Sequence, residues 1–123
     1  LLPSAPFSRV ISATEAETVK YFGNCFLALK VVFANQVFDL CAKLGIDYDT
    51  VCESAAADSR IGASHLKIAP DGYRGYGGGC FPKDMKAFIQ LGDLNQVDLA
   101  LLKTCERLNA ELTRIKKTAA SAR

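Results

Sequence analysis

The chain has 123 residues, half of them apolar, and its formal net charge is +2. This composition is typical of one folded domain with a modest core, and it excludes a disordered chain. So small a charge gives no reason to expect nucleic acid or an anionic membrane as a partner, and no apolar run reaches the length of a membrane span. The first residues lack the pattern of a signal peptide, and the abrupt ends indicate a piece of a longer protein.

Five cysteines are spread widely along the chain, and the single histidine is His65. No C-x-x-C pair occurs, so we expect neither a disulfide framework nor a metal site. Reduced thiols indicate a cytoplasmic protein. Four of the cysteines fall in helical patterns and are predicted to be small buried hydrophobic residues, namely Cys25, Cys41, Cys52 and Cys105.

Residues 14–44 are predicted to form one long helix. Ser12 followed by Glu15 is a capping box, in which two free backbone donors at the helix start are satisfied reciprocally. Gly45 suits the left-handed residue that ends many helices. Apolar residues recur between these ends in steps of three and four, at Val19, Phe22, Phe26, Leu29, Phe33, Val37 and Leu40. A helix of about 45 Å with a broad apolar face needs a partner to cover it, so we expect a homodimer through this helix.

A short helix and a long loop are predicted next. Asp47 or Asp49 can cap a helix that continues to about residue 57. Residues 58–81 hold six of the nine glycines and are predicted to form a loop. A loop of this length inside a compact domain is usually functional.

Two more helices complete the prediction. Pro82 suits the first turn of a helix that runs to residue 91, where Gly92 closes it. The last helix is predicted from about residue 97 to residue 119, with a buried side formed by Leu101, Leu102, Cys105, Leu108 and Leu112. No β-alternation is evident, so the predicted class is all-α, in a single domain of residues 1–123.

The segment GYGGGCFPKD, residues 75–84, gathers four glycines before Cys80. Glycines let a ligand approach the main chain closely. The start of the following helix and the nearby Lys83 both favour a thiolate, and Asp84 would lie one turn from the thiol if the helix begins early. These are parts for covalent chemistry at a carbonyl. A glycine-rich turn with a buried cysteine and a capping aspartate explains the same residues equally well.

Two further pairs could contribute to a site. Lys20 and Asn24 are four residues apart on the long helix, so they project from one face and could stabilise developing negative charge. Arg60 and Lys67 flank part of the loop and could bind phosphate or a sugar hydroxyl. From the residues alone, ordinary solvated side chains are the favoured interpretation of both pairs.

Three segments in this order, EAETVKYFGNCFLALKVVFAN, DSRIGASHLK and GYGGGCFPKD, resemble the central domain of the UDP-glucose/GDP-mannose dehydrogenase family. The resemblance extends from about residue 14 to residue 109, and the glycine-rich run ending in Cys-Phe-Pro-Lys-Asp is its most specific part. It implies an enzyme that oxidises the C6 alcohol of a nucleotide sugar to a carboxylate and reduces two NAD molecules. UDP-glucose, or a close relative, is the substrate that we expect.

The resemblance also implies catalytic roles. Cys80 would be the nucleophile that adds to the intermediate aldehyde and carries a thioester. Asp84 would assist the water that hydrolyses this thioester. Lys20 would stabilise the oxyanion, and Asn24 would hydrogen-bond the same reacting centre or its water.

Binding roles follow from the same resemblance. Arg60 would reach the substrate bound to the partner subunit, and Lys67 would lie at the sugar or its phosphates. Lys83 would face the NAD cofactor. The backbone around the hexose would be formed by Tyr76, Gly77, Gly78 and Gly79.

The sequence departs from the whole family in an important way. No G-x-G-x-x-G follows a predicted strand, so the NAD-binding domain is missing, as is the second α/β domain, and we expect this chain alone to be inactive. Gly79 stands where the family often has serine or tyrosine, which bears on sugar specificity. The alternatives are a GDP-mannose or UDP-N-acetyl-sugar dehydrogenase, a simpler hydroxyacid dehydrogenase that would need no Cys80, and a non-catalytic helical assembly module.

Overall fold

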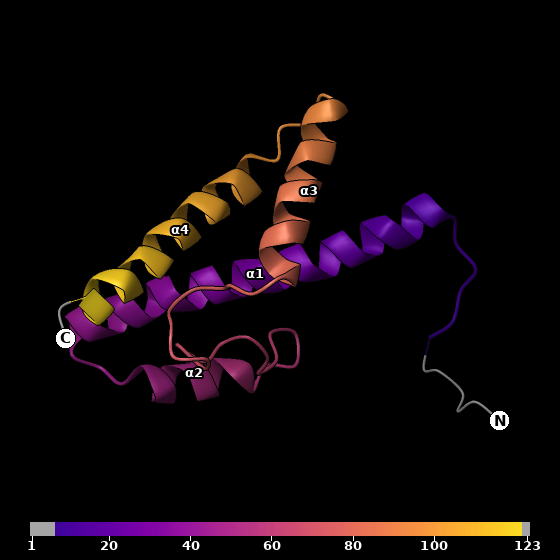
Figure 1. The fold of residues 1–123 in the computed structure, drawn as a ribbon. Coiled ribbons are helices and arrows are strands. Elements are labelled where there is room, and N and C mark those ends of the chain that lie inside the picture. Colours follow the sequence, from indigo (N-terminus) through magenta and orange to yellow (C-terminus); the bar gives the residue numbers. More distant parts are fainter. Residues whose placement is uncertain (1–6, 122–123) are drawn as a thin grey trace.

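The computed structural model describes residues 7–121, with side chains described for residues 7–115. Four α-helices follow one another in this part of the chain: α1 (Ala13–Leu44), α2 (Tyr48–Ala56), α3 (Cys80–Leu94) and α4 (Ala100–Ser121). Figure 1 shows α3 and α4 packed on one side of α1, with α2 and the long loop on the other side. No strand occurs within the described residues, and the predicted all-α class is confirmed.

The long helix α1 begins and ends where its sequence signals indicate. The Ser12 side chain accepts from the Glu15 N–H at 3.1 Å, and the Glu15 carboxylate accepts from the Ser12 N–H at 2.9 Å. Gly45 adopts the left-handed conformation with φ 69°, and its N–H bonds to carbonyls of the last turn. Both caps satisfy backbone groups that a helix end leaves free.

The buried face of α1 is not the one that its large apolar residues suggest. Its buried stripe consists of small or medium side chains, and it meets α3 and α4. Five of the seven large apolar residues predicted for this face are exposed, Phe33 by 65%, while Leu29 and Val37 pack half-buried against the core. Small residues let a neighbouring helix approach closely, which explains why they form the packed stripe. This stripe is Cys25, Ala28, Val32 and Asn35.

By length and hydropathy, α1 would also be able to span a membrane, and 33% of its most apolar window is buried inside the molecule. The expectation that no segment reaches that length was therefore too strict. The polar residues Asn24, Lys30 and Asn35 interrupt the apolar run, but the mean hydropathy over a whole window stays high. A packed core helix passes the same test, so this finding is weak evidence for a membrane span.

α2 fastens the long loop to α1. Asp47, the first of the two proposed caps, accepts from the Thr50 N–H at 3.0 Å. The Tyr48 hydroxyl donates to the Leu66 carbonyl at 2.6 Å. Tyr48 and Leu66 belong to a small core together with Ala34 and Cys41 of α1.

α3 is longer at both ends than predicted. It begins at Cys80, so Pro82 lies within the first turn, where its missing N–H has no cost. It continues past Gly92 to Leu94. Gly92 does not end the helix. It allows close packing instead, since a Cβ there would lie 2.8 Å from the Val97 carbonyl oxygen and from the Leu99 side chain.

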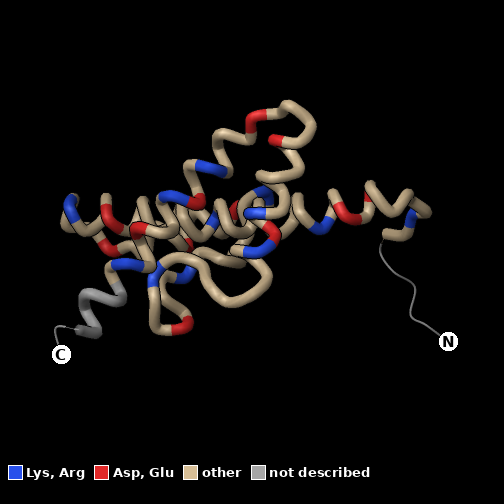
Figure 2. Tube along the Cα trace, turned by 45° about the horizontal axis from the view of Figure 1, so that its top comes forward, with Lys and Arg blue, Asp and Glu red and all other residues tan. Residues whose placement is uncertain are grey.

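α4 begins three residues later than predicted, and its predicted buried side faces the core except at Leu101. Leu101, predicted as buried, is 67% exposed, whereas Cys105 and Leu112 are buried as predicted. The Lys103 ammonium joins the two helices by contacting Asp93 of α3 at 2.8 Å and Asp98 at 2.9 Å. Acidic and basic residues are otherwise interleaved along the described chain (Figure 2).

Candidate active site

The crossing of α1 and α3 brings three of the predicted catalytic residues together. The Asn24 amide of α1 donates to the Asp84 carboxylate of α3 at 2.6 Å. The Lys20 ammonium, one turn earlier, lies 3.7 Å from the other Asp84 oxygen. The Asp84 side chain is 3% exposed and that of Lys20 is 61% exposed. A buried carboxylate therefore holds a lysine that still reaches solvent.

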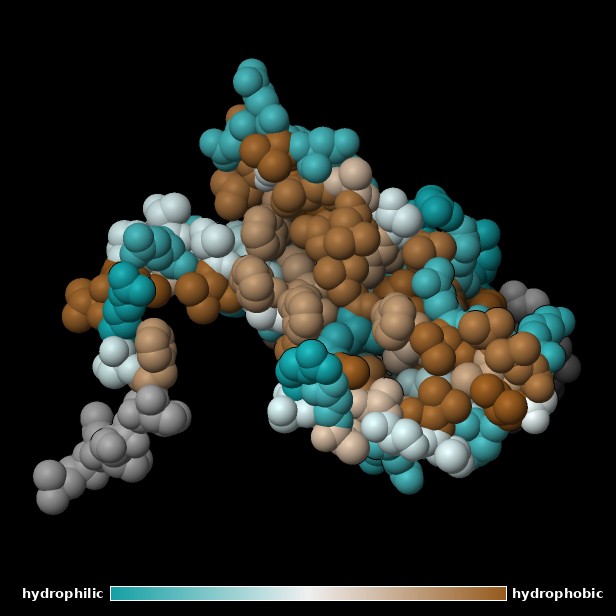
Figure 3. Space-filling model, turned by 180° about the vertical axis from the view of Figure 1, so that it is seen from behind, coloured by the Kyte–Doolittle hydropathy of each residue, from teal (hydrophilic) through white to brown (hydrophobic). Residues whose placement is uncertain are grey.

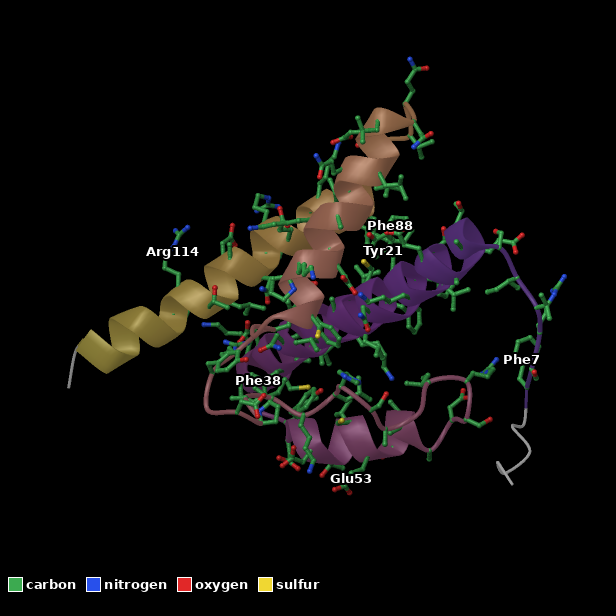
Figure 4. The ribbon with its side chains drawn as sticks, turned by 45° about the vertical axis from the view of Figure 1, so that its right-hand side comes forward. Phe7, Tyr21, Phe38, Glu53, Phe88 and Arg114 are labelled. Carbon is green, nitrogen blue, oxygen red and sulfur yellow. The ribbon has the colours of Figure 1, made fainter. Side chains whose placement is uncertain are left out.

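The same crossing is fixed by packing around the cluster. The Cys25 thiol donates to the Asp84 carbonyl at 3.8 Å, and Met85 beside it is fully buried. Tyr21 of α1 and Phe88 of α3 face each other (Figure 4), with ring centroids 5.4 Å apart. The sequence argument placed Lys20 and Asn24 at the edge of the core correctly, although the neighbouring Phe residues that it used are exposed.

Cys80 is exposed and is the first residue of α3. Asp84 follows it by one helical turn, as the early helix start requires. Gly79 occupies the N-cap position, and no side chain caps the helix start. The free amides of the first turn and the positive end of the helix dipole therefore lie beside the thiol. Lys83 is also exposed on this first turn.

The other cysteines are less suited to nucleophilic chemistry. Burial, with smaller contributions from the Asp84 charge and Cys105, raises the pKa of Cys25 to about 11. Burial likewise raises the pKa of Cys105 to about 11. Cys41 is buried and Cys52 is half-buried, so Cys80 is the exposed thiol of the five.

The positions before Cys80 require glycine for different physical reasons, and one of them does not require it. Gly75 and Gly78 adopt φ values of 79° and 76°, which other residues rarely tolerate. A Cβ at Gly77 would lie 2.9 Å from the Tyr73 hydroxyl and against its ring. Gly79 has open space around it, so neither backbone nor packing requires glycine there.

A cavity of about 450 Å³ opens between the long loop and α1. Its lining mixes polar and apolar groups, and the His65 ring lies 5.6 Å from that of Phe81, next to Cys80. Three residues predicted to bind substrate belong to the lining, namely Lys67, Tyr76 and Gly77. Gly78 and Gly79 lie outside it.

Arg60 is not brought to this cavity within the chain. It pairs with Asp58 at 2.6 Å, and its side chain is 88% exposed. Asp58 raises the pKa of Arg60, and Arg60 lowers that of Asp58. The residue is therefore available to a neighbouring molecule.

Sequence reasoning missed two residues that hold the loop. Arg74 bonds to Asn35 and Asp39 of α1, and Asn109 of α4 bonds to the Tyr76 backbone. The Asn109 signal was present, because it lies on the same helical stripe as Cys105 and Leu112. A polar residue within a buried stripe calls for a partner.

The part of the chain that the structure describes contains no dinucleotide site of the familiar kind. Such sites use a strand, a glycine turn and a helix, and the described residues contain no strand. Lys83 is the residue expected near NAD.

A helical scaffold with an exposed thiol at a helix start, one turn before a buried aspartate that contacts an asparagine and an exposed lysine, defines the class of this protein as a candidate thiol enzyme domain. Comparison with known proteins specifies it further. The chain belongs to the UDP-glucose/GDP-mannose dehydrogenase family, whose central domain matches residues 14–111.

The relatives agree with this assignment. The UDP-glucose 6-dehydrogenase YwqF of Bacillus subtilis (strain 168) is 39% identical over 107 residues, 85% of this chain and 23% of the relative. The UDP-glucose 6-dehydrogenase of Pseudomonas aeruginosa is 38% identical over 112 residues, covering 86% and 24%. A UDP-glucose dehydrogenase structure from Pyrobaculum islandicum matches with a TM-score of 0.74 and 42% identity, over 83% of this chain and 23% of that one. The chain thus spans about a quarter of these relatives.

Proposed function

We propose that this chain is the central domain of an NAD-dependent UDP-glucose 6-dehydrogenase, which converts UDP-glucose to UDP-glucuronate. The observation that carries the proposal is the placement of exposed Cys80 one turn before Asp84, which bonds Asn24 and lies near Lys20. The substrate named for the relatives supports the choice of UDP-glucose.

The conversion of an alcohol to an acid removes two hydrides, and the second removal needs a tetrahedral carbon. NAD, bound outside this chain, is the hydride acceptor. After the alcohol has become an aldehyde, the Cys80 sulfur bonds to the aldehyde carbon and gives a thiohemiacetal. Loss of hydride and a proton then leaves a thioester on Cys80. Water adds to the thioester carbon, the carbon–sulfur bond breaks, and the acid and the free thiol result.

The cluster of Lys20, Asn24 and Asp84 would support the charged stages of this reaction. The Lys20 ammonium would stabilise the oxygen that becomes negative when Cys80 adds. Asn24 would hydrogen-bond the same oxygen or the attacking water. Asp84 would accept a proton from that water and, until then, orients Asn24 and Lys20.

Substrate binding would use the cavity beside Cys80. Lys67 supplies a cation for the phosphates or sugar, while Tyr76 and Gly77 provide backbone around the hexose. The loop continues through the exposed Gly78 and Gly79 to the thiol. The mixed polar and apolar lining suits a sugar, which has both kinds of surface.

We further propose a homodimer through α1. An exposed apolar stripe runs along this helix, and hydrophobic side chains gather over the middle of one face of the molecule (Figure 3). The exposed Arg60, which pairs with Asp58 within the chain, would then reach the partner's substrate. The stripe consists of Val19, Phe22, Phe26, Phe33 and Leu40.

Trapping of the covalent intermediate tests the proposed chemistry. The full-length protein that contains this chain, carrying Asp84→Asn, is incubated with UDP-glucose and NAD, and its peptides are weighed by mass spectrometry. We expect an acyl adduct on the Cys80 peptide, which Cys80→Ala abolishes. Turnover of the wild type together with no adduct, or an adduct on another residue, would refute the assignment of Cys80. GDP-mannose and UDP-N-acetyl sugars, tested in parallel, identify the alternative substrates.

A further inference from the structure

The loop that leads to Cys80 is held by a pair of buried hydrogen bonds from α4. The Tyr76 N–H donates to the Asn109 side-chain oxygen at 2.7 Å, and the Asn109 amide donates to the Tyr76 carbonyl at 2.9 Å. Both residues are buried. One side chain thus satisfies both backbone groups of a loop residue, as a neighbouring strand would.

The residues before Tyr76 are fitted to this contact. A Cβ at Gly75 would collide with the Asn109 oxygen, so only glycine lets the loop approach this closely. Arg74 fixes the opposite side of the loop to α1: it bonds the Asn35 side chain at 2.9 Å and the Asn35 carbonyl at 3.1 Å. It also pairs with Asp39 at 3.0 Å. Three consecutive residues are therefore held between α1 and α4.

The start of α3 adjoins this anchor, while its second turn is held by α1 through Asp84. Only glycines 77–79 separate Tyr76 from Cys80, and they cannot by themselves fix a direction. No side chain caps the helix start. The Tyr76 ring packs edge-on against Phe81, the neighbour of Cys80, with centroids 6.3 Å apart. A shift of Tyr76 would therefore pass to Phe81 and to the thiol.

We propose that Asn109 is a positioning residue for Cys80: by holding the Tyr76 backbone, it fixes the path of the glycine loop and the place of the thiol. The catalytic part of this statement rests on the proposed function. Asn109 touches no substrate in this account. Its effect is expected in the rate of the chemical steps, because misplacement of a nucleophile by about 1 Å can cost about 100-fold in rate.

The test uses Asn109→Ala in the full-length protein, with Leu102→Ala as the control. Leu102 is half-buried on the same helix and packs against the core, but it bonds no loop residue. We expect Asn109→Ala to lower kcat about 10- to 100-fold, with KM within about threefold. Hydrogen exchange should accelerate about tenfold in residues 75–82. Leu102→Ala should leave both quantities within about twofold.

Asn109→Asp gives a second and sharper test. As a neutral carboxylic acid, aspartate can both accept from the Tyr76 N–H and donate to its carbonyl, whereas the carboxylate repels that carbonyl. The ratio of variant to wild-type kcat should therefore rise as pH falls from about 8 to about 6, because burial beside a carbonyl favours the neutral acid. Glu106, Cys105 and the Tyr76 phenol lie nearby in both proteins, so the comparison is made as a ratio to the wild type at each pH.

Three results would overturn the proposal: kcat and loop exchange unchanged in Asn109→Ala, the same losses in Leu102→Ala, or a ratio for Asn109→Asp that does not vary with pH. Hydrogen exchange needs no turnover. If the wild type oxidises no nucleotide sugar, the proposed function fails, and the exchange data still decide whether Asn109 holds the loop.

Discussion

Asp84 is the residue at which stability and chemistry coincide. Its carboxylate is buried at the crossing of α1 and α3, and its partners are the Asn24 amide and the more distant Lys20 ammonium. A buried charge is tolerated only when hydrogen bonds and counter-charges replace water. The free energy of unfolding should therefore fall strongly when Asn24 alone is lost, and the further loss of Asp84 should add little.

A double-mutant cycle checks this dependence. Asn24→Ala leaves the Asp84 carboxylate without its hydrogen-bond donor, so we expect a loss of about 1–3 kcal/mol in the free energy of unfolding. Because Asp84→Ala removes the buried charge itself, the double variant should be about 1–2 kcal/mol more stable than the sum of the single losses predicts. Urea unfolding measures all three. Simple additivity would contradict the direct coupling of the two residues.

The buried thiols make stability depend on alkaline pH. The pKa values of Cys25 and Cys105 are about 11 in the folded protein, against about 8.5 in an unfolded chain. The unfolded state thus loses its protons first, so the stabilisation is complete below about pH 8.5 and is lost as pH rises toward about 11. The urea concentration at the midpoint of unfolding should therefore decrease as pH rises from about 8 to about 10. The fall should be shallower in Cys25→Ala/Cys105→Ala; an equally steep fall would contradict this explanation.

At the scale of elements, local signals were sufficient for three of the helix ends near α1 and α2. The Ser12–Glu15 box, the left-handed Gly45 and the Asp47 cap all depend on neighbours in sequence. The ends of α3 depend instead on the fold. Gly92 looked like a stop signal, but it is glycine because the next segment packs against it.

The glycine loop gives a prediction with an internal control. Gly75→Ala meets both a left-handed backbone and the Asn109 side chain, so we expect a loss of at least about 2 kcal/mol in stability. Gly79→Ala, in open space and with an ordinary φ of −92°, should change stability by no more than about 0.5 kcal/mol. Thermal unfolding compares the two. Equal losses would mean that the loop is not held as described.

At the scale of the whole molecule, sequence patterns predicted which residue types form the site. They did not predict which of these residues contact one another. Lys20 and Asn24 are paired by helical spacing, whereas the contact of Asn24 with Asp84 joins residues 60 positions apart. The two faces of α1 show the same limit. Its large apolar residues mark a hydrophobic face, but periodicity cannot tell whether the same chain or a second copy covers it.

The exposed stripe on α1 predicts that association is sensitive to charge. Phe33→Asp would place a carboxylate in the proposed dimer interface, so we expect the full-length protein to shift from dimer to monomer at micromolar concentration. Val10→Asp is the control, since Val10 is almost fully exposed and precedes the helix. Sedimentation analysis distinguishes the species. A dimer that persists in Phe33→Asp would place the interface elsewhere.

The most direct test of the central claim is the number of NADH molecules formed for each UDP-glucose consumed by the full-length protein. A thiol that makes the aldehyde tetrahedral permits a second hydride removal, so the account predicts two NADH per sugar in the wild type. Cys80→Ala should not complete the second oxidation. One NADH per sugar in the wild type, or two per sugar in Cys80→Ala, would contradict the role assigned to Cys80.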